Sequence, residues 1–325
     1  MTKPIFASTA LFSWYDRHGR DLPWRRRWPE LAPAYHVWLS EIMLQQTVVN
    51  TVIPYFLDFI RRWPSIVDLA DAPLDDVLAA WAGLGYYARA RNLHKAAKFV
   101  AQEFNGQFPQ TVDALQALPG VGPYTAGAIA TIAFNRRSVV VDGNIERVMA
   151  RFFGVSAPLP AAKAEICRCY AAIMPSERPS DFPQALMDFA NAVCKLKGPN
   201  CQYCPFAGHC TAFAAGTVEA FPVKRAKKAK KTRLGIAFVA HTRSGKAFMV
   251  RRQDSGMLGG MLAFPSNGWA TQGEVFDSDA ALDAAPFPAA WRRLDHRVQH
   301  VFTHFAVEME VAVADITAPA DVAGP

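Results

Sequence analysis

Four cysteines lie in one short stretch of the chain, close enough in sequence to bind a metal centre together. Their spacing is C-x6-C-x2-C-x5-C, formed by Cys194, Cys201, Cys204 and Cys210. Thiolates are soft ligands that select zinc or an iron–sulfur cluster, and spacing alone does not separate the two. The stretch has a single C-x2-C pair, whereas zinc ribbons usually have two, so the pattern favours iron and sulfur. Cys167 and Cys169 lie outside the stretch and are interpreted as ordinary helix residues.

Two carboxyl groups occupy segments that could tune their acidity in opposite directions. Glu41 lies near Trp38 and Ile42, and burial there would raise its pKa and let it donate a proton near neutral pH. Asp142 precedes a predicted helix, whose dipole favours the ionised form. The plainer alternatives are a solvent-facing Glu41 and an Asp142 that only caps its helix. An acid paired with an anion is the arrangement that cleaves glycosidic bonds.

A turn containing Gly120 and Gly122 joins two predicted helices. The two glycines let the backbone approach another group closely, and Pro123 suits the first position of the second helix. Free N–H groups at such a helix start attract an anion, for which a DNA phosphate is a natural candidate. Taken alone, this turn is also a common tight connection between helices.

The positive charge of the chain is concentrated in one place. The 325 residues carry a net charge of +7, and seven Lys or Arg residues lie between Lys224 and Arg233 with no acid among them. Such a run repels itself and stays extended, which suits either a solubilising hinge or contact with a polyanion. Arg25, Arg26 and Arg27 are interpreted as phosphate contacts or as a solvated turn.

The first part of the chain must supply helices to position these groups. Apolar residues at three- and four-residue spacings predict helices up to Phe213, for example over 48–60, 74–84 and 163–174. With 51% hydrophobic and 19% charged residues, the chain has ample material for a buried core. The N-terminal part is therefore predicted to be mainly α.

The spacing of apolar residues changes after Arg233, from a helical pattern to short β-like runs. Short β-like runs at 236–240 and 247–251 flank a predicted turn at 242–245, and a further strand is expected at 305–314. We therefore predict three parts, listed here by residue range: a helical domain over 1–221, a basic linker over 222–233, and a smaller α+β domain over 234–325.

Membrane association is not expected. The longest apolar runs, such as 126–133, are far shorter than the roughly 20 residues that cross a bilayer. The first ten residues lack the pattern of a secretory signal peptide. The prediction is an intracellular protein of the cytoplasm or nucleoid that acts as a monomer.

Taken together, these motifs resemble the helix-hairpin-helix DNA glycosylases of the endonuclease III superfamily, and within them the adenine DNA glycosylases. The likeness runs from Leu11 to about Phe221 and extends more weakly through the C-terminal domain. Besides the hairpin and the cysteine spacing, it rests on the segments 22–25, 40–47, 83–89 and 141–147. The resemblance implies a glycosylase domain whose four cysteines hold one 4Fe-4S cluster, followed by a Nudix-like domain.

The resemblance also implies a base-excision-repair reaction. The substrate would be duplex DNA with adenine mispaired with 8-oxoguanine or guanine, and the N-glycosidic bond of the adenine would be hydrolysed. Glu41 would protonate the leaving adenine and later activate water, and Asp142 would stabilise the cationic sugar. Tyr124 and Asn144 would orient the site.

The target base must leave the duplex before such an enzyme can act on it. The resemblance implies that Gln46 and Tyr86 fill or wedge the DNA double helix beside the lesion, and that Gln184 recognises the flipped adenine. The hairpin glycines, Gly120 and Gly122, would contact the DNA backbone.

Tyr124 decides between relatives within the superfamily. The endonuclease III branch has a lysine at this place that forms a Schiff base, and a phenol cannot form an imine. A monofunctional glycosylase is therefore expected, and a bifunctional pyrimidine glycosylase with lyase activity is the first alternative. The second alternative, a non-catalytic DNA-binding protein, is opposed by the joint presence of Glu41 and Asp142.

The C-terminal part resembles the Nudix-like domain of adenine glycosylases through residues 256–265 and 300–304. The resemblance implies that Phe302, Thr303 and His304 recognise 8-oxoguanine, with Thr303 standing where the family has serine. No Arg-Glu-x-x-Glu-Glu cluster follows Pro265, so metal-dependent nucleotide hydrolysis is not expected.

Overall fold

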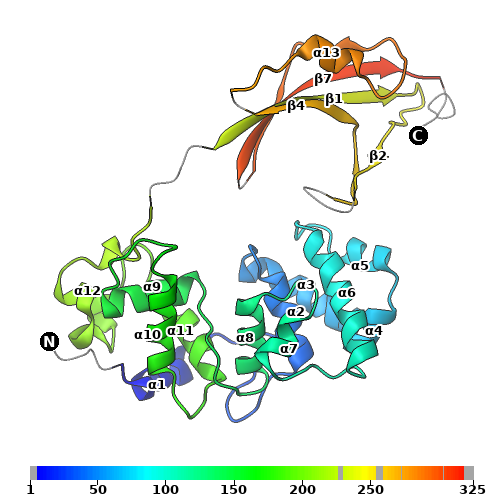
Figure 1. Cartoon of the computed structure of the whole chain (residues 1–325). Helices are drawn as coiled ribbons and strands as arrows, with labels where there is room; N and C mark the ends of the chain where they lie inside the picture. Colours follow the sequence, from blue (N-terminus) through cyan, green and yellow to red (C-terminus); the bar gives the residue numbers. More distant parts are fainter. Residues whose placement is uncertain (1–5, 226–229, 254–258, 272, 303, 318–325) are drawn as a thin grey trace. The chain divides into compact units, whose positions relative to one another are not determined.

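The computed structural model describes residues 6–225, 230–253, 259–271, 273–302 and 304–317. The chain divides into two compact units, residues 1–225 and 226–325 (Figure 1). The first unit is built from helices and the second combines a sheet with a helix, which confirms the predicted fold class.

Twelve α-helices and three short 3-10 turns make up the described part of the first unit. They are α1 (Ser8–His18), α2 (Ala34–Met43), α3 (Val49–Arg62), α4 (Ile66–Asp71), α5 (Leu74–Ala80), α6 (Ala88–Glu103), α7 (Val112–Gln116), α8 (Pro123–Ile132), α9 (Gly143–Phe153), α10 (Lys163–Ile173), α11 (Asp181–Ala192) and α12 (Thr211–Ala214), with η1 (Cys201–Tyr203), η2 (Ala207–His209) and η3 (Val218–Ala220). The helix predicted over 74–84 ends at Ala80, and the turn that follows contains Gly83 and Gly85 with φ values of 104° and 69°, which glycine adopts readily.

The helices form two groups. Figure 1 shows α2 to α8 together on one side, while α1 lies with α9 to α12 on the other. The first helix of the chain thus joins the last ones, because α1 packs against α11. Phe6 stacks on Phe206 with ring centroids 4.2 Å apart, which ties the start of the chain to the cysteine-bearing segment. Fully buried aromatic side chains such as Trp38, Trp81 and Phe182 fill the core.

The glycine turn connects α7 and α8 as the sequence predicts. Gly120 has a φ of 78°, and a Cβ atom there would lie 2.8 Å from the Cβ of Asn92. Gly122 precedes α8 in an extended conformation, and Pro123 is the first residue of that helix. The first N–H groups of α8 have no intrahelical partners, as at the start of any α-helix, and the binding of an anion there stays a prediction.

The elements of the mixed sheet in the second unit, with the helix that packs on it, are β1 (Lys231–His241), β4 (Ser266–Thr271), α13 (Ser278–Asp283), β5 (Arg292–Arg293), β6 (Val298–Val301) and β7 (Phe305–Asp315). The strand order is β4-β1-β7-β5, with β6 also paired to β7. Its central strands are parallel, from Lys231 opposite Phe305 to His241 opposite Asp315. The helix α13 packs against β1 and covers Ile236 and Phe238 (Figure 1).

Two boundaries differ from the sequence prediction. Residues 231–233 of the predicted linker belong to β1, where they pair with the start of β7; residues 226–229 lie outside the described part. The strand predicted over 247–251 is reduced to β2 (Val250–Arg251). After a single bridge from Ala247 to His241 the chain leaves β1, and β2 pairs with β3 (Leu262–Ala263) instead. Within the described residues, no helix combines the length and apolar character that a membrane crossing requires.

Candidate active site

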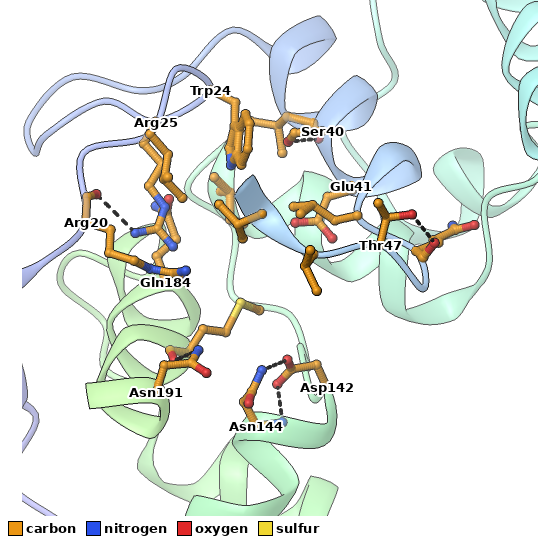
Figure 2. A pocket seen from close by; sticks show the side chains of 18 of the residues that line it. Arg20, Trp24, Arg25, Ser40, Glu41, Thr47, Asp142, Asn144, Gln184 and Asn191 are labelled. Carbon is orange, nitrogen blue, oxygen red and sulfur yellow. Dashed lines mark hydrogen bonds between the residues drawn. The ribbon is translucent and has the colours of Figure 1, made fainter. Parts of the chain in front are cut away.

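A cavity of about 550 Å³ lies between the two groups of helices in the first unit. Figure 2 shows Glu41 on one wall, Asp142 and Asn144 on the wall below it, and Arg20, Arg25 and Gln184 at one side. Five of the residues singled out from the sequence line it together, namely Glu41, Tyr124, Asp142, Asn144 and Gln184. They come from α2, α8, α9 and α11, so the fold brings together positions that are up to 143 residues apart, from 41 to 184.

Glu41 faces this cavity near the end of α2. Its pKa is raised to about 7, chiefly because the carboxyl is buried and also because the charge of Asp142 is near. A hydrogen bond from the Tyr124 phenol and the charge of Arg25 act in the opposite direction. The predicted rise in pKa is therefore found, and the carboxyl is an acid that holds its proton near neutral pH.

Asp142 is both the cap of α9 and part of the cavity wall. Its Oδ1 accepts hydrogen bonds from the backbone N–H groups of Asn144 (3.0 Å) and Ile145 (2.8 Å). Its Oδ2 accepts one from the side-chain Nδ2 of Asn144 at 2.8 Å. The capping role and the position in the cavity are therefore compatible, and three donors hold the carboxylate in one orientation.

Arg147 connects this carboxylate to the cysteine segment, a contact that the sequence reasoning missed. Its Nη2 donates to Asn144 Oδ1 at 3.2 Å and to the Ala190 carbonyl at 2.9 Å, and its Nε donates to the Cys194 carbonyl at 2.8 Å. The only local signal is that Arg147 follows Asn144 by three residues, which places both on one face of α9.

The interpretation of Arg25 as part of a solvated turn is wrong, whereas its contact with phosphate stays a prediction. Its side chain is buried and donates to both carboxylate oxygens of Asp188, at 2.7 Å and 3.1 Å. Arg20 donates to the same carboxylate at 2.7 Å. Asp188 lies on α11, 163 residues from Arg25, so no local pattern identifies the pair. Arg25 lines the cavity beside Trp24 and fixes one of its walls.

Gln184 is buried on α11 at the same side of the cavity. Its Nε2 donates to the Ser180 carbonyl one helical turn earlier, at 3.0 Å. This bond holds the amide group in one orientation at the cavity wall.

The four cysteines of the predicted metal site line one small cavity. Within the described part of the chain, no three His, Cys, Asp or Glu side chains are placed to hold a single metal ion. Burial raises the pKa of the Cys204 thiol to about 12, with smaller contributions from the other cysteines. Arg151, also buried, donates to the carbonyls of Cys194 (3.2 Å) and Lys195 (2.6 Å) and so holds the start of this segment.

Gln46 and Tyr86 are not among the residues that line the 550 Å³ cavity. Gln46 lies in the exposed loop between α2 and α3, and Tyr86 lies in the exposed loop between α5 and α6. Both have the left-handed backbone conformation, with φ values of 58° and 49°, that non-glycine residues rarely adopt. The hairpin glycines Gly120 and Gly122 likewise lie outside the cavity wall.

The residues predicted to contact 8-oxoguanine belong to the second unit. Phe302 is half-buried, and its ring lies 4.4 Å from that of His300 and 5.1 Å from that of Phe305. The Nζ of Lys230 donates to the Phe302 carbonyl at 2.7 Å. His304 is exposed, and Thr303 lies outside the described residues.

Comparisons with known proteins agree with both units. Residues 39–168 match the family described as HhH-GPD superfamily base excision DNA repair protein, and residues 236–323 match the NUDIX domain. The chain is 35% identical to the adenine DNA glycosylase of Homo sapiens over 93% of its own length, and it spans 65% of the length of that protein.

Further relatives support the same family. The adenine DNA glycosylase of Buchnera aphidicola subsp. Baizongia pistaciae is 38% identical, with 82% of this chain and 74% of that protein covered. A solved structure of a thermostable thymine-DNA glycosylase is similar with a TM-score of 0.58 at 26% identity, covering 64% of this chain and 94% of the other. The chain therefore belongs to the adenine DNA glycosylases of the HhH-GPD superfamily of base excision DNA repair proteins.

Proposed function

We propose that this protein hydrolyses the N-glycosidic bond of adenine that is mispaired with 8-oxoguanine or guanine in duplex DNA. The observation that carries the proposal is the pairing of Glu41 and Asp142 in one cavity, one carboxyl with a raised pKa and one held by three donors. A cavity of about 550 Å³ accommodates a flipped nucleobase, because pockets for small ligands span about 300–1,000 Å³.

Glu41 acts as the general acid. Its carboxyl, protonated near pH 7, donates a proton to N7 of the adenine while the bond from the sugar C1′ to N9 breaks, so that the base leaves as a neutral molecule. The hydrogen bond from Tyr124 orients the carboxyl towards the cavity. Once deprotonated, Glu41 accepts a proton from the water that attacks C1′.

Asp142 stabilises the positive charge that develops on the sugar. Its three hydrogen-bond donors keep the carboxylate fixed, so little reorganisation is needed when the charge appears. Asn144 supplies two of these three bonds and is the positioning residue for this anion.

Gln184 and the hairpin bind the two ends of the substrate nucleotide. The amide oxygen of Gln184 accepts a hydrogen bond from the exocyclic amino group of the flipped adenine. The start of α8 binds a backbone phosphate, and Gly122 leaves room for it, because a Cβ there would meet no heavy atom within 4 Å.

The four cysteines are assigned to a 4Fe-4S cluster. All four side chains line one small cavity, and four cysteine thiolates are the ligand set that holds such a cluster. The cluster would hold the segment 194–210 in its fold, and the cleavage chemistry uses Glu41 and Asp142 alone.

Single-turnover release of adenine from a duplex with adenine opposite 8-oxoguanine tests the function directly. Tyr124 offers no amine for a Schiff base, so strand breaks should appear only after alkaline treatment, and borohydride should trap no protein on the DNA. That result would exclude the alternative of a bifunctional glycosylase with lyase activity, whereas efficient trapping would contradict the monofunctional assignment. No adenine release at all would favour the binding-only alternative.

Removal of the second unit tests the proposed sensor of 8-oxoguanine. A chain ending at Arg225 keeps the whole first unit, including the cavity and the cysteine segment. We expect its adenine-release rate to fall about tenfold more on adenine opposite 8-oxoguanine than on adenine opposite guanine, since one lost base contact is worth about 1–3 kcal/mol. Equal losses on both mispairs would contradict a sensor role for Phe302 and His304.

A further inference from the structure

Arg89 joins the two loops that carry Gln46 and Tyr86. It is the second residue of α6, and its guanidinium reaches back over the end of α2 and the loop before α6. Its Nη1 donates to the carbonyls of Ile42 (3.1 Å), Met43 (3.0 Å) and Gln45 (2.6 Å). One end of the side chain therefore holds the backbone directly before Gln46.

The other end of the same guanidinium holds the second loop. Its Nη2 donates to the carbonyls of Leu84 (2.8 Å) and Gly85 (3.2 Å), and to Thr47 Oγ1 at 3.3 Å. The cation also lies over the rings of Trp81 and Tyr86, with its carbon 5.1 Å and 5.6 Å from their centroids. One side chain thus contacts the residues on both sides of Gln46 and the residues directly before Tyr86.

The partners of Arg89 distinguish it from a structural ion pair. The six acceptors named above are backbone carbonyls and one hydroxyl, and none is a carboxylate. Burial lowers the pKa of Arg89 from its usual range, which shows that the cation has lost part of its hydration at its position between the loops. Both loops also contain a non-glycine residue at positive φ, a conformation that costs energy and persists only where its surroundings enforce it.

We propose that Arg89 is a positioning residue that holds Gln46 and Tyr86 in the geometry needed to push the target adenine out of the duplex. This inference rests on the proposed function and on the role that the family resemblance implies for these two residues, which is to fill or wedge the DNA duplex beside the lesion. The planar guanidinium of arginine presents several N–H donors in a fixed geometry, so it can hold two backbone segments at once. The ammonium group of lysine is a point charge on a flexible side chain and cannot reproduce this.

Arg89→Lys is the variant that tests the proposal. We expect base extrusion, followed by the stopped-flow fluorescence of 2-aminopurine placed beside the target adenine, to slow by roughly 10- to 100-fold, because small misplacements of positioning groups cost up to about 100-fold. Adenine release from the mispaired duplex should fall by the same factor. Arg137→Lys is the matched control, because Arg137 donates to a single carbonyl, that of Met174, and its extrusion rate should stay within twofold of wild type.

The same substitution in a chain that lacks the Gln46 and Tyr86 side chains distinguishes a positioning role of Arg89 from a general loss of structure. In a chain that already has Gln46→Ala and Tyr86→Ala, adding Arg89→Lys should slow extrusion by less than twofold, since the side chains through which Arg89 acts are gone. The same loss in both backgrounds would overturn the proposal, and so would an Arg89→Lys rate within twofold of wild type. Extrusion is read independently of cleavage, so a wild-type chain that releases no adenine refutes the proposed function while the test of Arg89 still stands.

Thr47→Val provides a second variant in case Arg89→Lys disturbs folding, which thermal melting monitors. It removes one of the six acceptors and leaves the α2 carbonyls bonded. We expect about a threefold slower extrusion that again disappears in the Gln46→Ala and Tyr86→Ala background. A loss that persists in that background would contradict the proposal.

Discussion

Glu41→Gln is expected to abolish adenine release while leaving DNA binding intact. The amide fills the same space in the cavity but carries no proton that it can transfer, and general acid catalysis contributes up to about 10⁴-fold. Single-turnover release should therefore fall by about 10⁴-fold, and the dissociation constant for the mispaired duplex should change little. Active Glu41→Gln protein would show that another group protonates the base.

The pH profile of the wild-type chain supplies a second readout of the same residue. Because the reaction uses the protonated form of Glu41 and its pKa is raised to about 7, the single-turnover rate should be constant well below pH 7 and fall about tenfold per pH unit above it. Glu146→Gln is the matched control. Burial also raises the pKa of Glu146, but this residue does not line the cavity, so the variant should keep the wild-type rate and profile.

The substitution Glu41→Gln should raise stability at high pH although it lowers activity. The pKa of Glu41 is higher in the folded protein than its ordinary value of 4.5, so the folded state is favoured when the carboxyl is protonated and loses stability as pH rises from about 4.5 to about 7. Glu41→Gln has no such charge to bury. Its melting temperature should exceed that of wild type at pH 8, by the equivalent of at most about 3 kcal/mol, and the difference should vanish near pH 4.

Local sequence patterns predicted the turn, the helix start and the cysteine-bearing segment better than the long-range contacts that form the cavity walls. The cysteine spacing, the glycine turn and the capping position of Asp142 are short-range signals, because each depends on residues within one turn, helix start or loop. Arg25 was misread for the opposite reason. Its partner Asp188 lies 163 residues away, and a buried arginine looks like an exposed one until its carboxylate is known.

The lack of a local sequence signal also explains the other differences between the sequence prediction and the structure. Arg147 and Arg89 bind mainly backbone carbonyls, and a carbonyl has no sequence signature, so neither contact could be predicted. In the second unit the strand expected over 247–251 has the right composition, but strand length depends on which neighbour offers free hydrogen bonds. Here the neighbour of β2 is the two-residue strand β3, and the pairing is equally short.

Asp142→Asn is expected to separate the charge of this residue from its structural role. Asparagine is as good an N-cap as aspartate, so the start of α9 should be kept and the melting temperature should change by only a few degrees. The negative charge facing the sugar is lost, and adenine release should fall by about 10³-fold or more, the effect of removing a major electrostatic contact in an active site. Wild-type activity in this variant would remove Asp142 from the mechanism.

The residual activity of Asp142→Asn also tests whether the two carboxyls form one unit. The charge of Asp142 raises the pKa of Glu41, so its removal should move the fall in rate to lower pH. Asp277→Asn is the matched control, since Asp277 caps α13 with bonds to the N–H groups of Asp279 (3.1 Å) and Ala280 (2.9 Å) in the other unit. That variant should keep the wild-type rate and profile on adenine opposite guanine. An unshifted profile in Asp142→Asn would mean that the two carboxyls titrate independently, and the raised pKa of Glu41 would then be due to its burial alone.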